Sequence, residues 1–191
     1  YNIGLPVTKY DEIIDRNSQI PGAQLLEKMV SGYYMGSLVK EVCKDLYNNK
    51  VIFTSSTADT GTFFDQSFNA LMVENFILYP QKTSEQYNCT MEDAEIIKAV
   101  SQAVLKRTVR LVAATYLGIL FHQENGTRIN NKHIIAIDGT IYEKMPKASI
   151  LMEETFKEVL GSDAENIGIR LVKDGSGLGA AIAAAVAITQ K

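Results

Sequence analysis

The stretch from residue 168 to residue 188 constrains the fold of this chain more than any other. An apolar strand pattern runs into the turn Asp174-Gly-Ser-Gly-Leu-Gly179, and an almost wholly apolar helix pattern follows. Glycines in such a turn permit positive φ angles and leave no side chain to hold a ligand away from the backbone amides. The stretch predicts a strand, a turn and a helix of an α/β protein, with a phosphate or nucleotide near the helix start. A turn that only connects two elements is the alternative.

A second strand pattern, His133 to Ile137, also ends in an Asp-Gly turn, Asp138-Gly139-Thr140. Two such turns indicate neighbouring strand ends, where ligands of open α/β sheets bind. Residues 175–180 match the loose G-x-G-x-x-A pattern of dinucleotide folds, but the later strand and acidic residue of that fingerprint are not in the sequence, and neither is a P-loop pattern. The paired turns therefore predict a nucleotide crevice of another kind.

These turns resemble a known family. Ile137-Asp-Gly-Thr-Ile-Tyr142 and Asp174-Gly-Ser-Gly-Leu-Gly-Ala-Ala181 resemble the two nucleotide-proximal turns of the eukaryotic-type hexokinases, in the actin-like ATPase superfamily. Pro21-Gly22, followed by Leu26-Glu-Lys-Met-Val-Ser-Gly-Tyr-Tyr-Met-Gly36, is similar to the segment in which a hexokinase glutamate reaches the sugar. The resemblance implies an α/β fold: the helix-rich large lobe of an actin-like ATPase (ribonuclease H-like) fold, with a C-terminal helix that returns to a missing small lobe.

The resemblance also implies substrates and site residues. A hexose such as glucose would be phosphorylated on its 6-hydroxyl by ATP with Mg²⁺. Glu27 would accept charge-assisted hydrogen bonds from the sugar, with Gln24 one turn away, whereas without the resemblance Glu27 is interpreted as a solvated helix residue. The implied nucleotide-binding residues are Gly32, Thr60, Gly61, Gly139, Thr140, Asp174, Gly175, Ser176 and Gly177.

No catalytic base is assigned in this sequence. In the family, the catalytic aspartate, the β- and γ-phosphate loops and most sugar contacts lie upstream of the segment that resembles Tyr1. We therefore expect residues 1–191 to be the C-terminal portion of a hexokinase, with about 175–191 crossing back to the small lobe and the missing N-terminal portion as a partner. Without that portion, the chain is expected to be inactive.

Three positions depart from the family pattern. Met145 precedes Pro146 where histidine is usual, Leu178 stands where a basic residue is common, and Ser37 stands where glutamate is usual. These departures indicate a divergent member. They put in doubt contacts from a basic side chain near the nucleotide, but not contacts from the backbone.

The amino-acid composition limits the classes of partner that are expected. A formal net charge of −3, with 21% charged residues, gives no electrostatic reason to expect nucleic acid or an anionic membrane. The longest apolar stretch, Leu178 to Ile188, is shorter than the roughly twenty residues of a membrane span, and a buried helix is expected there. Two cysteines and two histidines without metal-ligand spacing predict no disulfide framework and no metal site. The expected location is cytoplasmic, with free thiols.

Two functions of other classes are alternatives. One is a non-catalytic actin-like nucleotide-binding or regulatory protein, which keeps the crevice but binds a partner. The other is an α/β lobe whose glycine turns merely connect elements, and a nucleotide titration would separate it from the rest.

Helical spacing predicts several elements. Helices are expected over about 23–48, over 63–76, from Thr90 to about Phe121, and from Pro146 to Gly161. Residues 1–20 are expected to be loop with at most one helical turn, 77–89 a polar connection, and 163–165 a solvated acidic loop. Two glycines about one turn apart inside the first helix, Gly32 and Gly36, indicate close packing or the approach of a ligand to the backbone.

Overall fold

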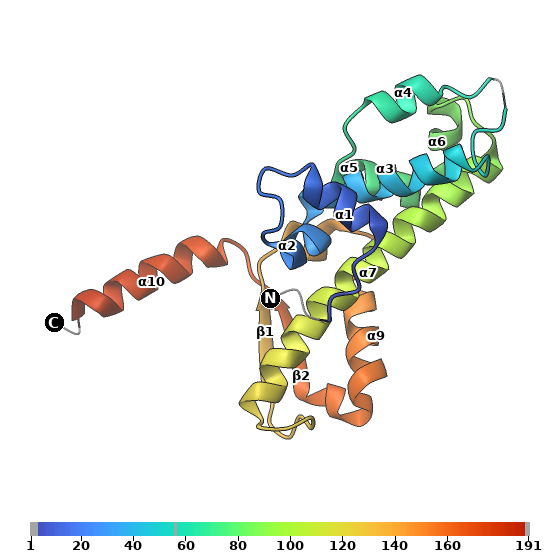
Figure 1. Ribbon diagram of the computed structural model, residues 1–191. Coiled ribbons are helices and arrows are strands. Elements are labelled where there is room, and N and C mark those ends of the chain that lie inside the picture. The colour runs from blue at the N-terminus through green and yellow to red at the C-terminus, as the bar shows by residue number, and fades with distance from the viewer. Residues whose placement is uncertain (1–3, 56, 190–191) are drawn as a thin grey trace. The chain divides into compact units, whose positions relative to one another are not determined.

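The computed structural model describes residues 4–55 and 57–189, apart from the side chains of Thr140, Ser176 and Thr189. Within this part the chain is mostly helical, with a small parallel sheet (Figure 1), which confirms the helix-rich α/β class. The chain divides into two compact units, residues 1–112 and residues 113–191, and the long helix α7 (Met91–Gln123) contributes to both.

Unit 1 opens with α1 (Lys9–Arg16), where the sequence predicted loop. Thr8 caps this helix: its hydroxyl accepts the N–H of Asp11, and the Asp11 carboxylate accepts the N–H of Thr8 at 2.8 Å. The same buried carboxylate pairs with Arg107 of α7 at 2.8 Å. The loop prediction is wrong because this capping box and the tertiary ion pair stabilise two helical turns.

The single helix expected over residues 23–48 is two helices, α2 (Leu25–Val30) and α3 (Gly32–Asn48). Ser31 separates them: its ψ of 135° is extended, and its hydroxyl accepts the N–H of Tyr33 at 3.2 Å. Serine favours such caps because its side chain competes for backbone hydrogen bonds. Gly32 therefore begins α3 instead of interrupting a longer helix.

Gly36 lies inside α3 for a packing reason. A Cβ at this position would lie 2.4 Å from the carbonyl carbon and oxygen of Phe68. The backbone of residues 68–69 therefore packs directly on α3, and only glycine permits this approach. Close packing, one of the two interpretations of the paired glycines, is confirmed for Gly36.

Three short helices replace the helix expected over 63–76 and the polar connection expected over 77–89. Side chains of Asp59 and Asn69 cap the first two, and Pro80 occupies the first turn of the third, where its missing N–H has no intrahelical partner to lose. These helices are α4 (Thr60–Asp65), α5 (Ala70–Leu78) and α6 (Pro80–Gln86).

An aromatic cluster forms the core between these helices. The Phe63 ring is fully buried and meets the rings of Phe53, Phe68 and Tyr87 edge to face, with centroids 4.8–4.9 Å apart. Edge-to-face pairs add to the stability that the buried apolar area provides.

The long helix α7 begins where the sequence predicted, after a capping Thr90. The Thr90 hydroxyl accepts the N–H of Asp93 at 3.1 Å, and the Asp93 carboxylate accepts the N–H of Thr90 at 3.0 Å. The buried Asp93 carboxylate also accepts the N–H of Phe53 at 2.8 Å, and Phe53 has a positive φ of 54°. Asp93 thus ties α7 to the segment that precedes α4.

Unit 2 contains the sheet. Strand β1 (His133–Ile137) pairs in parallel with β2 (Ile167–Leu171). The crossover between them consists of α8 (Thr140–Lys144), α9 (Ala148–Leu160) and a 3₁₀ helix, η1 (Gly161–Asn166). As predicted, α9 ends at Gly161, which has a positive φ of 58°. The buried strand expected at 134–137 is buried on one face only: Ile135 and Ile137 are buried, and Ile134 is 61% exposed.

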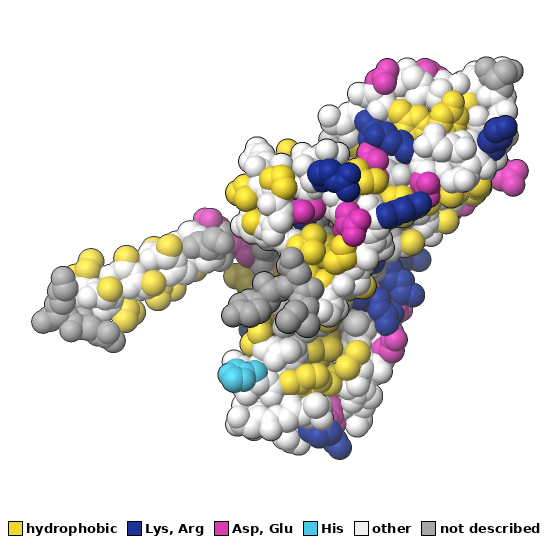
Figure 2. Space-filling model, in the orientation of Figure 1, with side chains coloured by type: hydrophobic (Ala, Val, Ile, Leu, Met, Phe, Trp, Pro, Cys, Tyr) yellow, Lys and Arg dark blue, Asp and Glu magenta, His cyan; other side chains and the backbone are white. Residues whose placement is uncertain are grey.

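The final helix is α10 (Gly175–Thr189). Residues 177–188 are all exposed within the described part of the chain, and Figure 2 shows apolar side chains along this helix. Four of the exposed side chains are large and apolar: Leu178, Ile182, Val186 and Ile188. The prediction of a buried helix is wrong within the described residues, because residues 177–188 of α10 are exposed to solvent.

Candidate functional site

The two residues expected to face a sugar lie at the start of α2. Gly22, with a φ of 81°, turns the chain after Pro21, and Gln24 takes a left-handed φ of 54° as the residue that precedes α2. Gln24 and Glu27 are both exposed. The structure therefore places an accessible amide and an accessible carboxylate at one end of a six-residue helix.

Buried Lys28, which was not predicted from the sequence, anchors this segment by an ion pair and a hydrogen bond. The Lys28 ammonium lies 2.6 Å from Oδ1 of Asp15 and donates to the carbonyl of Ile20 at 2.6 Å. The N–H of Gly22 also donates to Asp15, at 2.9 Å from Oδ2. The Lys28 ammonium, and after it the Gly22 N–H, lower the pKa of Asp15 below its usual value. A lysine in an apolar run was the only signal in the sequence.

Next to Gly32, a cavity of about 450 Å³ opens on α3. Tyr33, Ser37 and Asn69 supply hydroxyl and amide groups to its wall, and Lys40 supplies an ammonium that donates to the Gln66 carbonyl at 2.7 Å. Burial, with the nearby positive charge of Lys44 as a second cause, lowers the pKa of Lys40. Gly32, beside this cavity, was predicted from the sequence as a nucleotide-binding residue, whereas the polar residues of the cavity wall were not predicted as a site.

Thr60 and Gly61 form the first turn of α4. Thr60 is half-buried, Gly61 is exposed, and the Asp59 side chain that caps the helix accepts the N–H of Thr62 at 2.9 Å. Hydrogen bonding from the Thr62 side chain, and after it from the Thr62 N–H, lowers the pKa of Asp59. A Cβ at Gly61 would meet only Asp59 Oδ1, at 3.8 Å. The protein itself therefore gives no steric reason for glycine at this position.

In unit 2, the two Asp-Gly turns are neighbours, as the sequence predicted. Because β1 and β2 are parallel and in register, Ile137 and Leu171 end the strands side by side, and the N–H of Val172 donates to the Ile137 carbonyl at 2.8 Å. A Cβ at Gly175 would lie 3.5 Å from Oδ2 of Asp138. The first turn of α10 therefore lies against the end of β1.

The glycines of the second turn do not have the positive φ angles that their pattern suggested. Gly175 and Gly177 belong to α10, and Asp174 instead takes the left-handed conformation, with a φ of 57°. A Cβ at Gly177 would lie 3.1 Å from Asp174 Oδ1, whereas one at Gly179 would meet nothing within 4 Å. Gly177 is therefore constrained by space and Gly179 is not.

The first turn differs from the second. Gly139 has an extended φ of −172°, which any residue adopts, and a Cβ there would be 3.9 Å from the Ile137 side chain. The side chains of Thr140 and Ser176 lie outside the described part of the structure.

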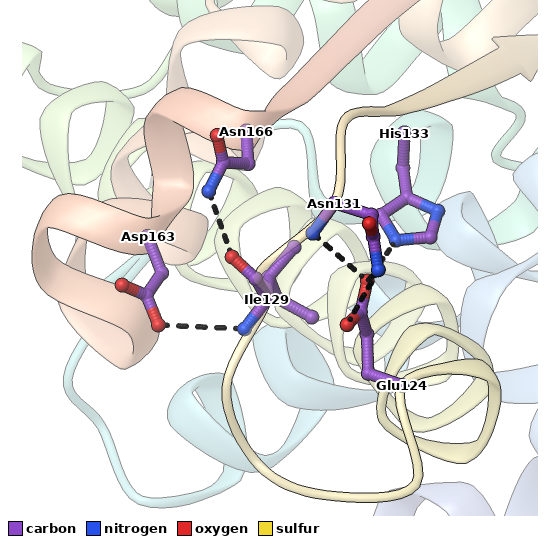
Figure 3. Close-up of polar contacts among 6 residues, drawn as sticks. All are labelled: Glu124, Ile129, Asn131, His133, Asp163 and Asn166. Atoms are coloured by element: carbon purple, nitrogen blue, oxygen red, sulfur yellow. Dashed lines mark hydrogen bonds and ion pairs between the residues drawn. The ribbon is translucent and has the colours of Figure 1, made fainter.

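A polar clasp fixes the loop that leads into β1 (Figure 3). Glu124 accepts the backbone N–H of Asn131 at 3.1 Å and lies 2.7 Å from Nε2 of His133, the first residue of β1. The bond with His133, followed by those from Asn131, lowers the pKa of Glu124 to about 2. The clasp therefore holds the loop at the start of β1, the strand that leads to Asp138.

The second half of this clasp comes from η1. Asp163 accepts the N–H of Ile129 at 3.3 Å and pairs with Arg128, while the Asn166 amide donates to the Ile129 carbonyl at 2.7 Å. Asp163 is therefore buried in a 3₁₀ helix. The prediction of a solvated acidic loop at 163–165 is wrong for this residue, because a distant arginine and a backbone N–H satisfy its carboxylate.

Among residues 4–55 and 57–189, no group of three or more histidine, cysteine or acidic side chains has the arrangement of a metal site. The same part of the chain contains no helix long and apolar enough to cross a bilayer.

Comparisons with known proteins point to one family. A family model described as Hexokinase matches residues 2–186. "Hexokinase-4, chloroplastic" of Oryza sativa subsp. japonica is 32% identical over 97% of this chain and 39% of its own length. "Hexokinase-2" of Saccharomyces cerevisiae is 30% identical over 97% of this chain and 40% of its own length. The chain thus spans about two fifths of the length of these curated relatives.

Solved structures agree on the fold. A structure described as "Crystal structure of Hexokinase" is 23% identical, with a TM-score of 0.76, over 92% of this chain and 40% of its own. A hexokinase from Schistosoma mansoni complexed with glucose is 22% identical, with a TM-score of 0.70, over 86% of this chain and 38% of its own. At these identities the likeness establishes the fold alone.

Proposed function

Because this chain belongs to the hexokinase family, we propose that it is the large-lobe part of an enzyme that transfers the γ-phosphoryl group of ATP to the 6-hydroxyl of a hexose such as glucose. The family match over residues 2–186 is the observation that carries this function. The fold, which is that of the solved hexokinase structures and thus actin-like, agrees with it.

The proposed enzyme contains a further, N-terminal portion that acts as the partner of these residues. The relatives support this, since the chain matches only about two fifths of their length. The exposed apolar side chains of α10 support it too, because a helix of this composition is stable in water only when its apolar face is covered. In this proposal, residues from about 175 to 191 cross to a small lobe.

We assign the sugar to Glu27 and Gln24. Glu27 is an exposed carboxylate in the segment that resembles the sugar-binding motif, and an ionised carboxylate accepts strong hydrogen bonds from two neighbouring hydroxyls. Gln24 precedes it by three residues and offers both a donor and an acceptor.

Replacing Glu27 with alanine is expected to weaken hexose binding by the complete enzyme. The expected loss is about 1.5 to 3 kcal/mol, the scale of a hydrogen bond to a charged group. The KM for glucose and a direct glucose titration would measure it, and Glu12→Ala, which removes an exposed carboxylate from α1, is the matched control. A variant with normal glucose affinity would contradict the assignment.

We assign the nucleoside of ATP to the paired turns of unit 2. Adenine and ribose would lie at Gly139, Thr140, Asp174, Gly175, Ser176 and Gly177, and we further assign Gly32, Thr60 and Gly61 to the nucleotide. The adjacency of the two turns supports this crevice. Mg²⁺ would arrive with the ATP phosphates, since it is usually held by only one or two carboxylates together with phosphates and water.

Replacing Gly177 with valine is expected to weaken ATP binding while hexose binding changes little. A Cβ at this position would lie 3.1 Å from Asp174 Oδ1, so the carboxylate that shapes the turn would have to shift. Gly179→Val is the control, because it makes the same change two residues later in open space. Equal losses of ATP and hexose affinity in a folded Gly177→Val protein would argue against this placement.

We place the enzyme in the cytoplasm, where reducing conditions keep thiols free. Cys43 and Cys89 are both free and buried, and burial raises the pKa of the Cys43 thiol to about 12. Fractionation of cells is the test, since one relative is described as chloroplastic.

A further inference from the structure

We propose that Asp15 and Lys28 are positioning residues for the hexose: their ion pair fixes the loop between α1 and α2 and so orients Glu27 and Gln24. This inference rests on the proposed function, in which Glu27 binds the sugar. Neither residue would touch the substrate.

The Lys28 ammonium joins three parts of the chain. It pairs with Asp15 on α1, donates to the Ile20 carbonyl in the loop, and belongs itself to α2. Asp15 in turn accepts the N–H of Gly22, so the loop is held at both Ile20 and Gly22. The pair of Lys98 with Glu95, by contrast, joins two residues of α7 and restrains no loop.

The arrangement suits positioning because α2 is short. A six-residue helix has little stability of its own, so its orientation depends on what anchors it. Successive residues of a helix point about 100° apart, so burying Lys28 turns Glu27 toward another side. The Lys28 side chain is 6% exposed, whereas Glu27 is exposed.

The burial of Lys28 also makes the loop conformation specific. A buried ammonium is costly unless it is paired and hydrogen-bonded, and Lys28 has its partners only in the loop conformation that brings Asp15 and the Ile20 carbonyl to it. The same loop includes Gly22 and Gln24, both with left-handed φ angles. We infer that loss of the pair lets Gln24 and Glu27 leave the geometry that holds the sugar.

The test uses the complete enzyme with Lys28→Met, which keeps the aliphatic stem, and with Asp15→Asn, which keeps the shape. Each is expected to raise the KM for glucose about tenfold, the scale of losing one charge-assisted hydrogen bond, with the KM for ATP unchanged. Lys28→Arg should restore part of the affinity, because it keeps the charge. Lys98→Met is the matched control and should leave both KM values unchanged.

Coupling to Glu27 separates positioning from general damage. In a Glu27→Ala background, Lys28→Met should raise the KM for glucose much less than it does alone, since both changes remove the same contact. Fully additive effects, or equal losses for glucose and ATP, would overturn the positioning role and leave the proposed function standing. Normal glucose affinity in Glu27→Ala alone would instead refute the sugar assignment, and the positioning role with it. Asp15→Asn is the milder variant and decides the question if Lys28→Met does not fold.

Discussion

Residues 1–191, expressed alone, are expected to transfer no phosphoryl group from ATP to glucose. Transfer needs a group that accepts the proton of the sugar hydroxyl and elements that hold the β- and γ-phosphates. The acidic residues nearest the motifs have other proposed roles: we assign Glu27 to the sugar, and Asp138 and Asp174 to shaping the paired turns. A coupled assay with glucose, ATP and Mg²⁺ on the purified chain measures the outcome.

The informative comparison adds the proposed N-terminal portion as a separate polypeptide. Activity that appears only in the mixture would support the proposal that the N-terminal portion supplies the catalytic base and the phosphate contacts. Turnover by the 191 residues alone would show that they contain the base and the phosphate contacts, and the assignments of the acidic residues would then be wrong. The Glu27→Ala chain, mixed in the same way, provides the control for sugar binding.

Replacing Asp93 with alanine is expected to lower the free energy of unfolding of unit 1 by about 3 kcal/mol. The change removes a helix cap, worth about 1 kcal/mol, and leaves the buried N–H of Phe53 without its acceptor, which costs about 1 to 3 kcal/mol. Urea unfolding followed by circular dichroism would measure the loss as a lower midpoint with an unchanged slope.

Glu92→Ala is the matched control for Asp93. Glu92 is the neighbouring residue in the first turn of α7, carries the same charge and is exposed. Its replacement should cost less than about 1 kcal/mol, the scale of a charge near a helix terminus. Equal effects of the two substitutions would mean that the contact between Asp93 and Phe53 adds nothing to stability.

Local signals predicted the elements whose ends are set by neighbouring residues. Thr90 with Asp93 starts α7, Gly161 ends α9, and the apolar run before Asp138 forms a strand. The neighbouring strand ends were also predicted, because each of the two strand patterns runs into an Asp-Gly turn. The family resemblance rested on these same segments, and the match over residues 2–186 confirms it.

Contacts between distant residues could not be predicted. Asp163 is buried because Arg128 reaches it, and Lys28 is buried because Asp15 lies on another helix. Neither pair has a characteristic spacing. Ser31 was overlooked for a different reason: the apolar stripe continues through it, so periodicity gave no sign of the break between α2 and α3.

The candidate site residues also divide into features that the sequence predicts and features that depend on the tertiary fold. Glu27 and Gln24 follow from a motif, and the structure finds them accessible, but their anchors come from the tertiary fold. The glycine turn was recognised while its backbone was misjudged, because the left-handed residue is Asp174 and the glycines begin a helix.

The contact at Gly36 has a mechanical consequence for the cavity on α3. With the Phe68 backbone packed against Gly36, the cavity wall formed by residues 67–69 cannot slide inward along α3 without a steric clash. The backbone contact at Gly36 therefore holds two walls of the cavity together, one from Tyr33 and Ser37 and one from Asn69.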